Sequence, residues 1–215
     1  MTNVFKRPGK ASIRRKLFEL GEIALKRNGW QVERLQGIGK SSIRKISKGD
    51  ERHVVAIRTT QGQWIAFPRK DNDAGWLTLD DVDFVVAVTV DDKDDPKEGV
   101  VYMVPGDEMR ERFDRAYTAR LKAGHTIPIG RGVWVSMFLA EDPDAASSIG
   151  GGIALGKKPL LSARLDAVHN EEAPEVVAPV SASRAEAPLT IADAKRRLAH
   201  SLGVAPEKIK IVIEA

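Results

Sequence analysis

The sequence predicts an α/β fold of the α+β kind, in which a central mixed sheet is flanked by helices. Two segments, residues 11–29 and 106–124, repeat apolar side chains at the spacing of an amphipathic helix. Between them lies a series of short runs rich in β-branched residues, separated by turn-forming glycine, proline and aspartate. Each helix has one apolar face, so packing both helices on one sheet buries those faces.

The first helix is preceded by a basic lead, residues 1–10. Its apolar positions recur three or four residues apart, at Ile13, Leu17, Leu20 and Ala24. Gly29 stands where a helix would end, because glycine adopts the left-handed conformation of a C-terminal cap without strain.

The predicted strands are residues 30–35, 42–47, 53–60, 64–68, 82–90, 100–105 and 132–139. Residues 82–90, VDFVVAVTV, form the longest apolar run and are expected to be buried on both faces. Residues 42–47 are ambiguous, since Ile43 and Ile46 are three apart, which also suits a helical turn. The second helix, 106–124, places Met109, Phe113 and Ala116 on one face and ends at Gly124.

Composition divides the chain into a core domain at residues 11–140 and three other segments, of which the basic lead is one. Residues 141–188 are rich in alanine, proline, glutamate and glycine and lack periodicity, so they are expected to be a flexible linker. Residues 189–215 then predict a small helix-strand unit that is too short to fold alone. It is expected to dock on the core domain, on a partner protein or on a second copy of the chain.

Bulk composition excludes several classes of protein. The chain has 215 residues with 42% apolar residues, enough for a core, and no cysteine for a disulfide or thiolate metal site. No apolar run has the roughly 18 residues of a membrane helix, and no secretory signal is visible. A cytoplasmic protein without cofactor or membrane partner is therefore expected.

Charge is distributed unevenly along the chain. Residues 1–60 contain 15 Lys or Arg against 5 acids, a net charge of +10, whereas residues 61–115 contain 7 against 14, a net charge of −7. A basic face of this kind attracts phosphate backbones.

The order of elements in residues 11–124 resembles the PD-(D/E)XK nuclease superfamily, particularly its resolvase-like branch. The resemblance is carried by ALKRNGWQVERLQGIGKSSIRKI, then HVVAIRTT, VDFVVAVTV and VVYMVP. It implies a restriction-endonuclease-like core, with a metal centre on the hairpin within residues 43–60. In that family one strand supplies an aspartate, and the next supplies an acid-x-lysine triplet.

On this chain the places implied for the metal-binding acids carry Arg44 and Ala56, and the place of the lysine carries Arg58. At least two carboxylates are normally needed to hold Mg²⁺, and a cation at the site repels it. We therefore expect no metal, and we expect the three side chains to converge at a site that binds phosphate without cutting it. The alternative for Arg44 and Arg58 is an internal ion pair with Glu33 or Asp50.

The sequence therefore predicts a non-catalytic nucleic-acid-binding or regulatory protein, with duplex DNA as the expected partner. One alternative is a metal-dependent nuclease with relocated acids; another is a protein-interaction adaptor that uses the acidic residues of 71–115. The expected phosphate contacts are Arg14, Arg15, Lys16, Lys40, Arg44, Lys45 and Arg58. Trp64, Trp76 and Trp134 are assigned to the core, with base stacking as the alternative.

Overall fold

A computed structural model describes residues 8–35, 42–71, 73–128 and 130–169 of the chain. The chain divides into two compact units, residues 1–172 and 173–215. The second unit lies outside the described residues, and so does the helix-strand unit predicted for 189–215.

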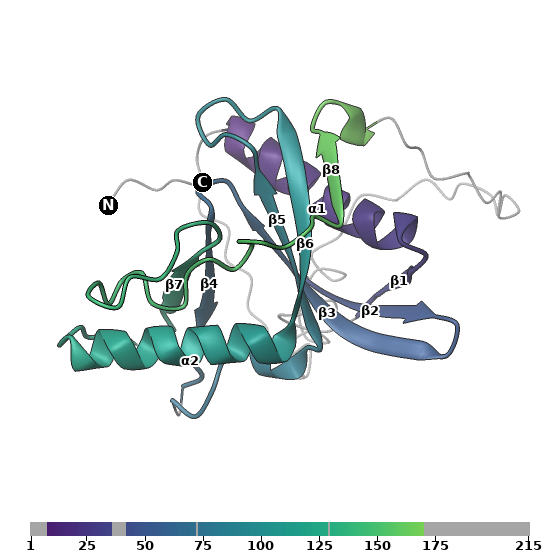
Figure 1. The fold of residues 1–215 in the computed structure, drawn as a ribbon. Helices are drawn as coiled ribbons and strands as arrows, with labels where there is room; N and C mark the ends of the chain where they lie inside the picture. The colour runs from purple at the N-terminus through teal and green to yellow at the C-terminus, as the bar shows by residue number, and fades with distance from the viewer. Residues whose placement is uncertain (1–7, 36–41, 72, 129, 170–215) are drawn as a thin grey trace, which may run out of the picture. The chain divides into compact units, whose positions relative to one another are not determined.

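A six-stranded mixed sheet forms the centre of the first unit (Figure 1). Its strands are β1 (Gln31–Arg34), β2 (Ile43–Lys48), β3 (Glu51–Thr60), β5 (Phe84–Val90), β6 (Glu98–Pro105) and β8 (Leu161–Arg164), in the spatial order β1-β2-β3-β5-β6-β8. The strands β3 and β5 are parallel, and the other neighbours are antiparallel. The predicted mixed sheet is thus confirmed, and the ambiguous segment 42–47 is a strand.

Two further strands, β4 (Trp64–Pro68) and β7 (Gly132–Ser136), form a separate antiparallel pair. The chain passes through β4 and the short helix η2 (Leu79–Asp81) on its way from β3 to β5. Apolar alternation places Ile65 and Phe67 on the inner face of this pair, where both are buried. The alternation of apolar residues in the sequence did not show that these two strands form a sheet of their own.

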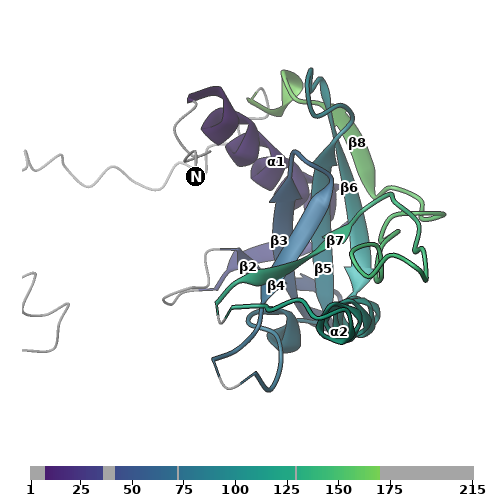
Figure 2. The same ribbon diagram turned by 90° about the vertical axis from the view of Figure 1, so that its left-hand side faces the viewer.

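The helices α1 (Pro8–Arg27) and α2 (Gly106–Lys122) cover opposite faces of the sheet (Figures 1 and 2). One core cluster joins α1 to Val55 and Ile57 of β3, and the other joins α2 and the β4–β7 pair to Ala56. The first helix ends as its sequence predicts, because Gly29 has a φ of 85° and its N–H donates to the carbonyl of Lys26.

The linker expected at 141–188 is wrong for the part that the structure describes. Residues 150–154 are buried, Ile153 belongs to the core on the α2 side, and β8 pairs with β6. The glycines that suggested flexibility serve close packing instead: a Cβ on Gly150 would lie 2.5 Å from the carbonyl oxygen of Arg112. The structure also contains the short helix η3 (Ala167–His169) after β8.

Within the described ranges, no helix is long and apolar enough to cross a membrane.

Candidate functional site

The hairpin register separates the residues that were expected to converge. In the β2–β3 pair, Ile43 lies opposite Ala56 and Arg44 lies opposite Val55. Directly opposed residues share a face of the sheet, so Arg44 lies on the α1 face with Val55. Ala56 belongs to the core on the other face, and Arg58, two residues further along β3, shares that face. The prediction that Arg44, Ala56 and Arg58 converge is therefore wrong.

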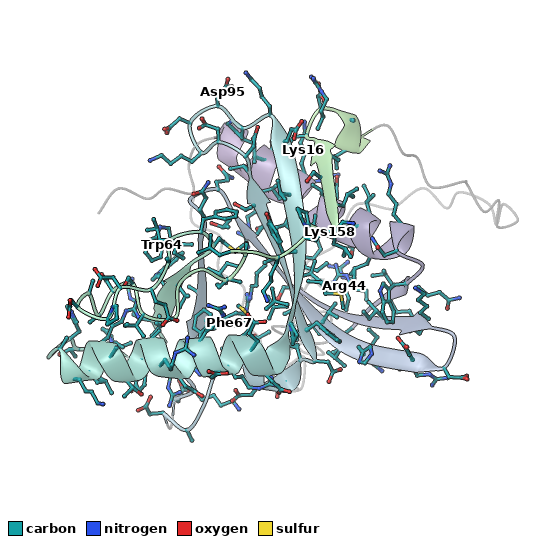
Figure 3. All side chains as sticks on the ribbon, in the orientation of Figure 1. Lys16, Arg44, Trp64, Phe67, Asp95 and Lys158 are labelled. Atoms are coloured by element: carbon teal, nitrogen blue, oxygen red, sulfur yellow. The ribbon has the colours of Figure 1, made fainter. Side chains whose placement is uncertain are left out.

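Arg44 is buried against α1 and has an internal partner. Its side chain is 6% exposed, and its Nε donates to Oε1 of Glu22 at 2.5 Å. The guanidinium also lies 4.9 Å from the centroid of the Phe18 ring, and Nη1 donates to the carbonyl of Ile43. Figure 3 shows Arg44 beside α1, on the side of the sheet away from Phe67. The charge of Arg44 is thus balanced inside the domain, by Glu22 rather than by Glu33 or Asp50.

Arg58 has the opposite environment. Its guanidinium lies 4.5 Å from the centroid of the Phe67 ring, and its buried Nε has no hydrogen-bond partner among the residues that the structure describes. Within the described part of the chain, no carboxylate forms an ion pair with Arg58. Burial lowers the pKa of Arg58 from its ordinary value, and the positive charge of Arg14 lowers it further. An arginine still stays protonated, so a positive charge without a counter-charge remains here.

This charge lies where β3 loses a neighbouring strand. The pairing of β2 with β3 ends at Ile43 and Ala56, after which the N–H of Ile57 donates to the carbonyl of Ser42. Among the described residues, β3 has no partner strand on that side at Arg58. The structure therefore places Arg58 at an edge of the sheet, beside α1 through Arg14 and beside β4 through Phe67.

The remaining predicted contacts do not all gather at Arg58. Arg15 is exposed and pairs with Glu19 one turn along the helix at 2.9 Å, and Lys16 follows it on α1. Lys45 is exposed on β2 and lies on the face opposite Arg44, because side chains alternate along a strand. Lys40 lies outside the described residues. Of the predicted set, the structure brings Arg14 and Arg58 close enough to interact electrostatically.

The acids that a relocated metal site would need are dispersed. Glu19 and Glu22 pair with Arg15 and Arg44. Glu33 is exposed on β1, and Asp50 and Glu51 are exposed at the turn between β2 and β3. No group of three or more histidine and acidic side chains suited to a metal ion occurs in the described ranges.

Several acidic side chains of residues 71–115 have partners inside the first unit. Asp80 pairs with Lys70 at 2.8 Å, and Asp114 accepts a hydrogen bond from Nε1 of Trp76 at the same distance. The carboxylate of Glu108 bridges two cations, Arg112 and Lys157, and their hydrogen bonds lower its pKa although burial acts in the opposite direction. These contacts hold α2 to its surroundings and leave fewer acids for a basic partner protein.

Comparisons with known proteins add no identity to this picture, because no family model, curated protein or solved structure matches the chain.

Proposed function

We propose that the chain is a non-catalytic nucleic-acid-binding protein whose phosphate contacts centre on Arg58 and Arg14. The observation that carries the proposal is the positive charge of Arg58, whose buried Nε has no hydrogen-bond partner in the described ranges and whose pKa the charge of Arg14 lowers. A buried charge without a counter-charge is costly, and a phosphate oxygen would supply both the charge and the missing acceptor.

A repeating phosphate backbone fits this surface better than a single small anion does. Arg15 and Lys16 follow Arg14 on α1, and the first 60 residues have a net charge of +10. Contacts of this type position a backbone and do not read sequence, so broad sequence tolerance is expected. We expect duplex DNA as one partner.

Binding without cleavage is the favoured activity, since the acids that could hold a catalytic metal are paired with arginines or dispersed. A nuclease with relocated acids predicts turnover of plasmid DNA in Mg²⁺ or Mn²⁺ that is lost in Glu19→Ala.

The proposal predicts that labelled duplex DNA binds at low salt and that the affinity falls steeply as salt rises. About five phosphate contacts would give a slope of log Ka against log salt of about −4.5. Arg58→Met retains an apolar side chain against Phe67 but removes the charge. We expect it to weaken binding by roughly tenfold and to reduce the steepness of the slope by about 1. Fluorescence anisotropy across a salt series measures both quantities.

Lys93→Met is the matched control, because it removes one exposed positive charge from the acidic loop between β5 and β6. Its affinity should stay within about twofold of the unmodified protein, since the aspartates on either side of Lys93 repel phosphate. If the two variants lose equal affinity for DNA, the effect of Arg58→Met comes from net charge alone. If the unmodified protein does not bind DNA at low salt, the proposed function is refuted.

A further inference from the structure

The four tryptophans of the chain divide into two that are engaged and two that are not. Trp76 is 1% exposed and its Nε1 donates to Asp114, and Trp30 has an edge contact with the His53 ring. Trp134 is 57% exposed, and Trp64 is half-buried. Among the described residues, neither Trp64 nor Trp134 has a ring contact or a partner for its indole N–H. The assignment of all three candidate tryptophans to the core is thus wrong for Trp134.

The two unengaged indoles share the outer face of the β4–β7 pair. Trp64 lies opposite Ser136, and Ala66 lies opposite Trp134. Side chains alternate along β4, and Ile65 and Phe67 fill the inner face, so Trp64 and Ala66 take the outer one with Trp134. Trp64 and Trp134 are therefore diagonal neighbours on facing strands, which places their backbone positions about 7–8 Å apart. Both indoles can then reach a common planar ligand.

Positive charge adjoins this aromatic face at one end of the pair, where Pro68 of β4 lies opposite Gly132 of β7. Arg131 immediately precedes β7, is exposed, and forms no ion pair with any residue that the structure describes. At the other end, Oγ1 of Thr60 accepts a hydrogen bond from the backbone N–H of Trp64. This contact ties the start of β4 to the end of β3, two residues after Arg58. A phosphate next to a stacked base could thus meet Arg131, whereas Arg58 lies on the inner side of the pair with Phe67.

We propose that the outer face of the β4–β7 pair, formed by Trp64, Ala66 and Trp134, binds the unpaired bases of a single-stranded nucleic-acid segment. The proposal rests on the proposed nucleic-acid function and specifies which form of the polymer is held. Bases in a duplex present only their edges, whereas unpaired bases present the flat faces that stack on indoles. The exposed Arg131 beside the two indoles favours a polyanion over an apolar protein segment as the occupant of this face.

The test compares a fluorescein-labelled oligothymidylate of about 12 nucleotides with a duplex of the same length, using Trp134→Ala in the full chain. Single-strand affinity should fall about 5- to 150-fold, which corresponds to roughly 1–3 kcal/mol, and duplex affinity should change less than twofold. Trp134→Tyr should restore most of the loss, because a phenol ring also stacks. Leu77→Ala is the matched control, since Leu77 is 54% exposed and lies outside both strands of the pair.

The outcomes separate this inference from the function on which it rests. If Trp134→Ala binds the single strand normally while Arg58→Met loses affinity for DNA, the aromatic face is not a base site and the phosphate site stands. If no strand of either form binds at low salt, both proposals fail. If Trp134→Ala changes only the sedimentation behaviour of the protein, the face is a contact between copies of the chain and the inference is overturned.

Discussion

Arg44 and Arg58 lie on adjacent strands of one sheet, each with its guanidinium near a phenylalanine ring, yet their charges are treated differently. Arg44 meets the carboxylate of Glu22 on α1, whereas Arg58 meets the positive charge of Arg14 from the same helix. A buried charge is tolerated when it is paired, and its burial is costly when it is not. Arg44 therefore stabilises the fold, while Arg58 keeps a positive charge that a ligand can neutralise.

The largest effect should come from removing the partner of Arg44. We expect Glu22→Ala to lower the free energy of unfolding by about 3 kcal/mol, because it removes the carboxylate that accepts a hydrogen bond from Nε of the buried Arg44. Urea denaturation followed by circular dichroism measures the change. Arg15→Ala is the control, since its pair with Glu19 is exposed and should contribute less than about 1 kcal/mol. Equal destabilisation by the two variants would mean that the Arg44 pair behaves like a surface pair.

A smaller change in the free energy of unfolding, of opposite sign, is expected for a substitution at Arg58. Arg58→Met removes a charge whose Nε has no acceptor and leaves an apolar chain on Phe67, so the unfolding free energy should rise by about 1 kcal/mol. The same variant should bind DNA more weakly, because a residue that is needed for binding can destabilise the fold. A lower urea midpoint than that of the unmodified protein would show that Arg58 stabilises the fold.

The smallest effect should follow from giving Arg58 a counter-charge. Arg14→Glu replaces the repulsion between two cations with an attraction, and we expect about 0.5 kcal/mol of added stability together with weaker DNA binding. Arg15→Glu changes the net charge equally but places two carboxylates one helical turn apart, so its stability should fall slightly. Parallel urea titrations measure the change in unfolding free energy for each variant. If both changes have the same sign, the charge of Arg14 does not act on Arg58.

Part of the distinction between the two arginines was available in the sequence. The turn at Gly49 and Asp50 leaves a two-residue hairpin loop, which pairs Lys48 with Glu51 and, four steps back, Arg44 with Val55. Counting this register shows that Arg44 and Arg58 occupy opposite faces, so their convergence could have been excluded beforehand. The identity of the partners could not, because Glu22 reaches Arg44 only once α1 has packed on the sheet.

Local patterns also predicted most elements and failed where composition had more than one physical meaning. Glycines at 150–152 suggested a flexible linker, but there they allow the backbone to pack closely against α2 and the segment after β7. The segment Val133, Trp134, Val135 reads as apolar throughout, yet only the two valines face the core. The residue type alone does not tell whether a tryptophan faces the core or the solvent. That depends on which sheet its strand joins and on which face of the sheet is covered.

By itself, the sequence determined the two helices with the glycines that follow them, the strands up to residue 136 and the excess of positive charge in the first 60 residues, although α1 begins at Pro8, inside the lead predicted for 1–10. These depend on local periodicity, turn chemistry and counting, which act over a few residues. The tertiary structure alone decided that β4 and β7 leave the central sheet and that Glu22 neutralises Arg44. It also decided that Arg58 has no carboxylate partner among the described residues. The reason is physical: ion pairing and burial depend on distances between segments far apart in the chain, and only packing sets those distances.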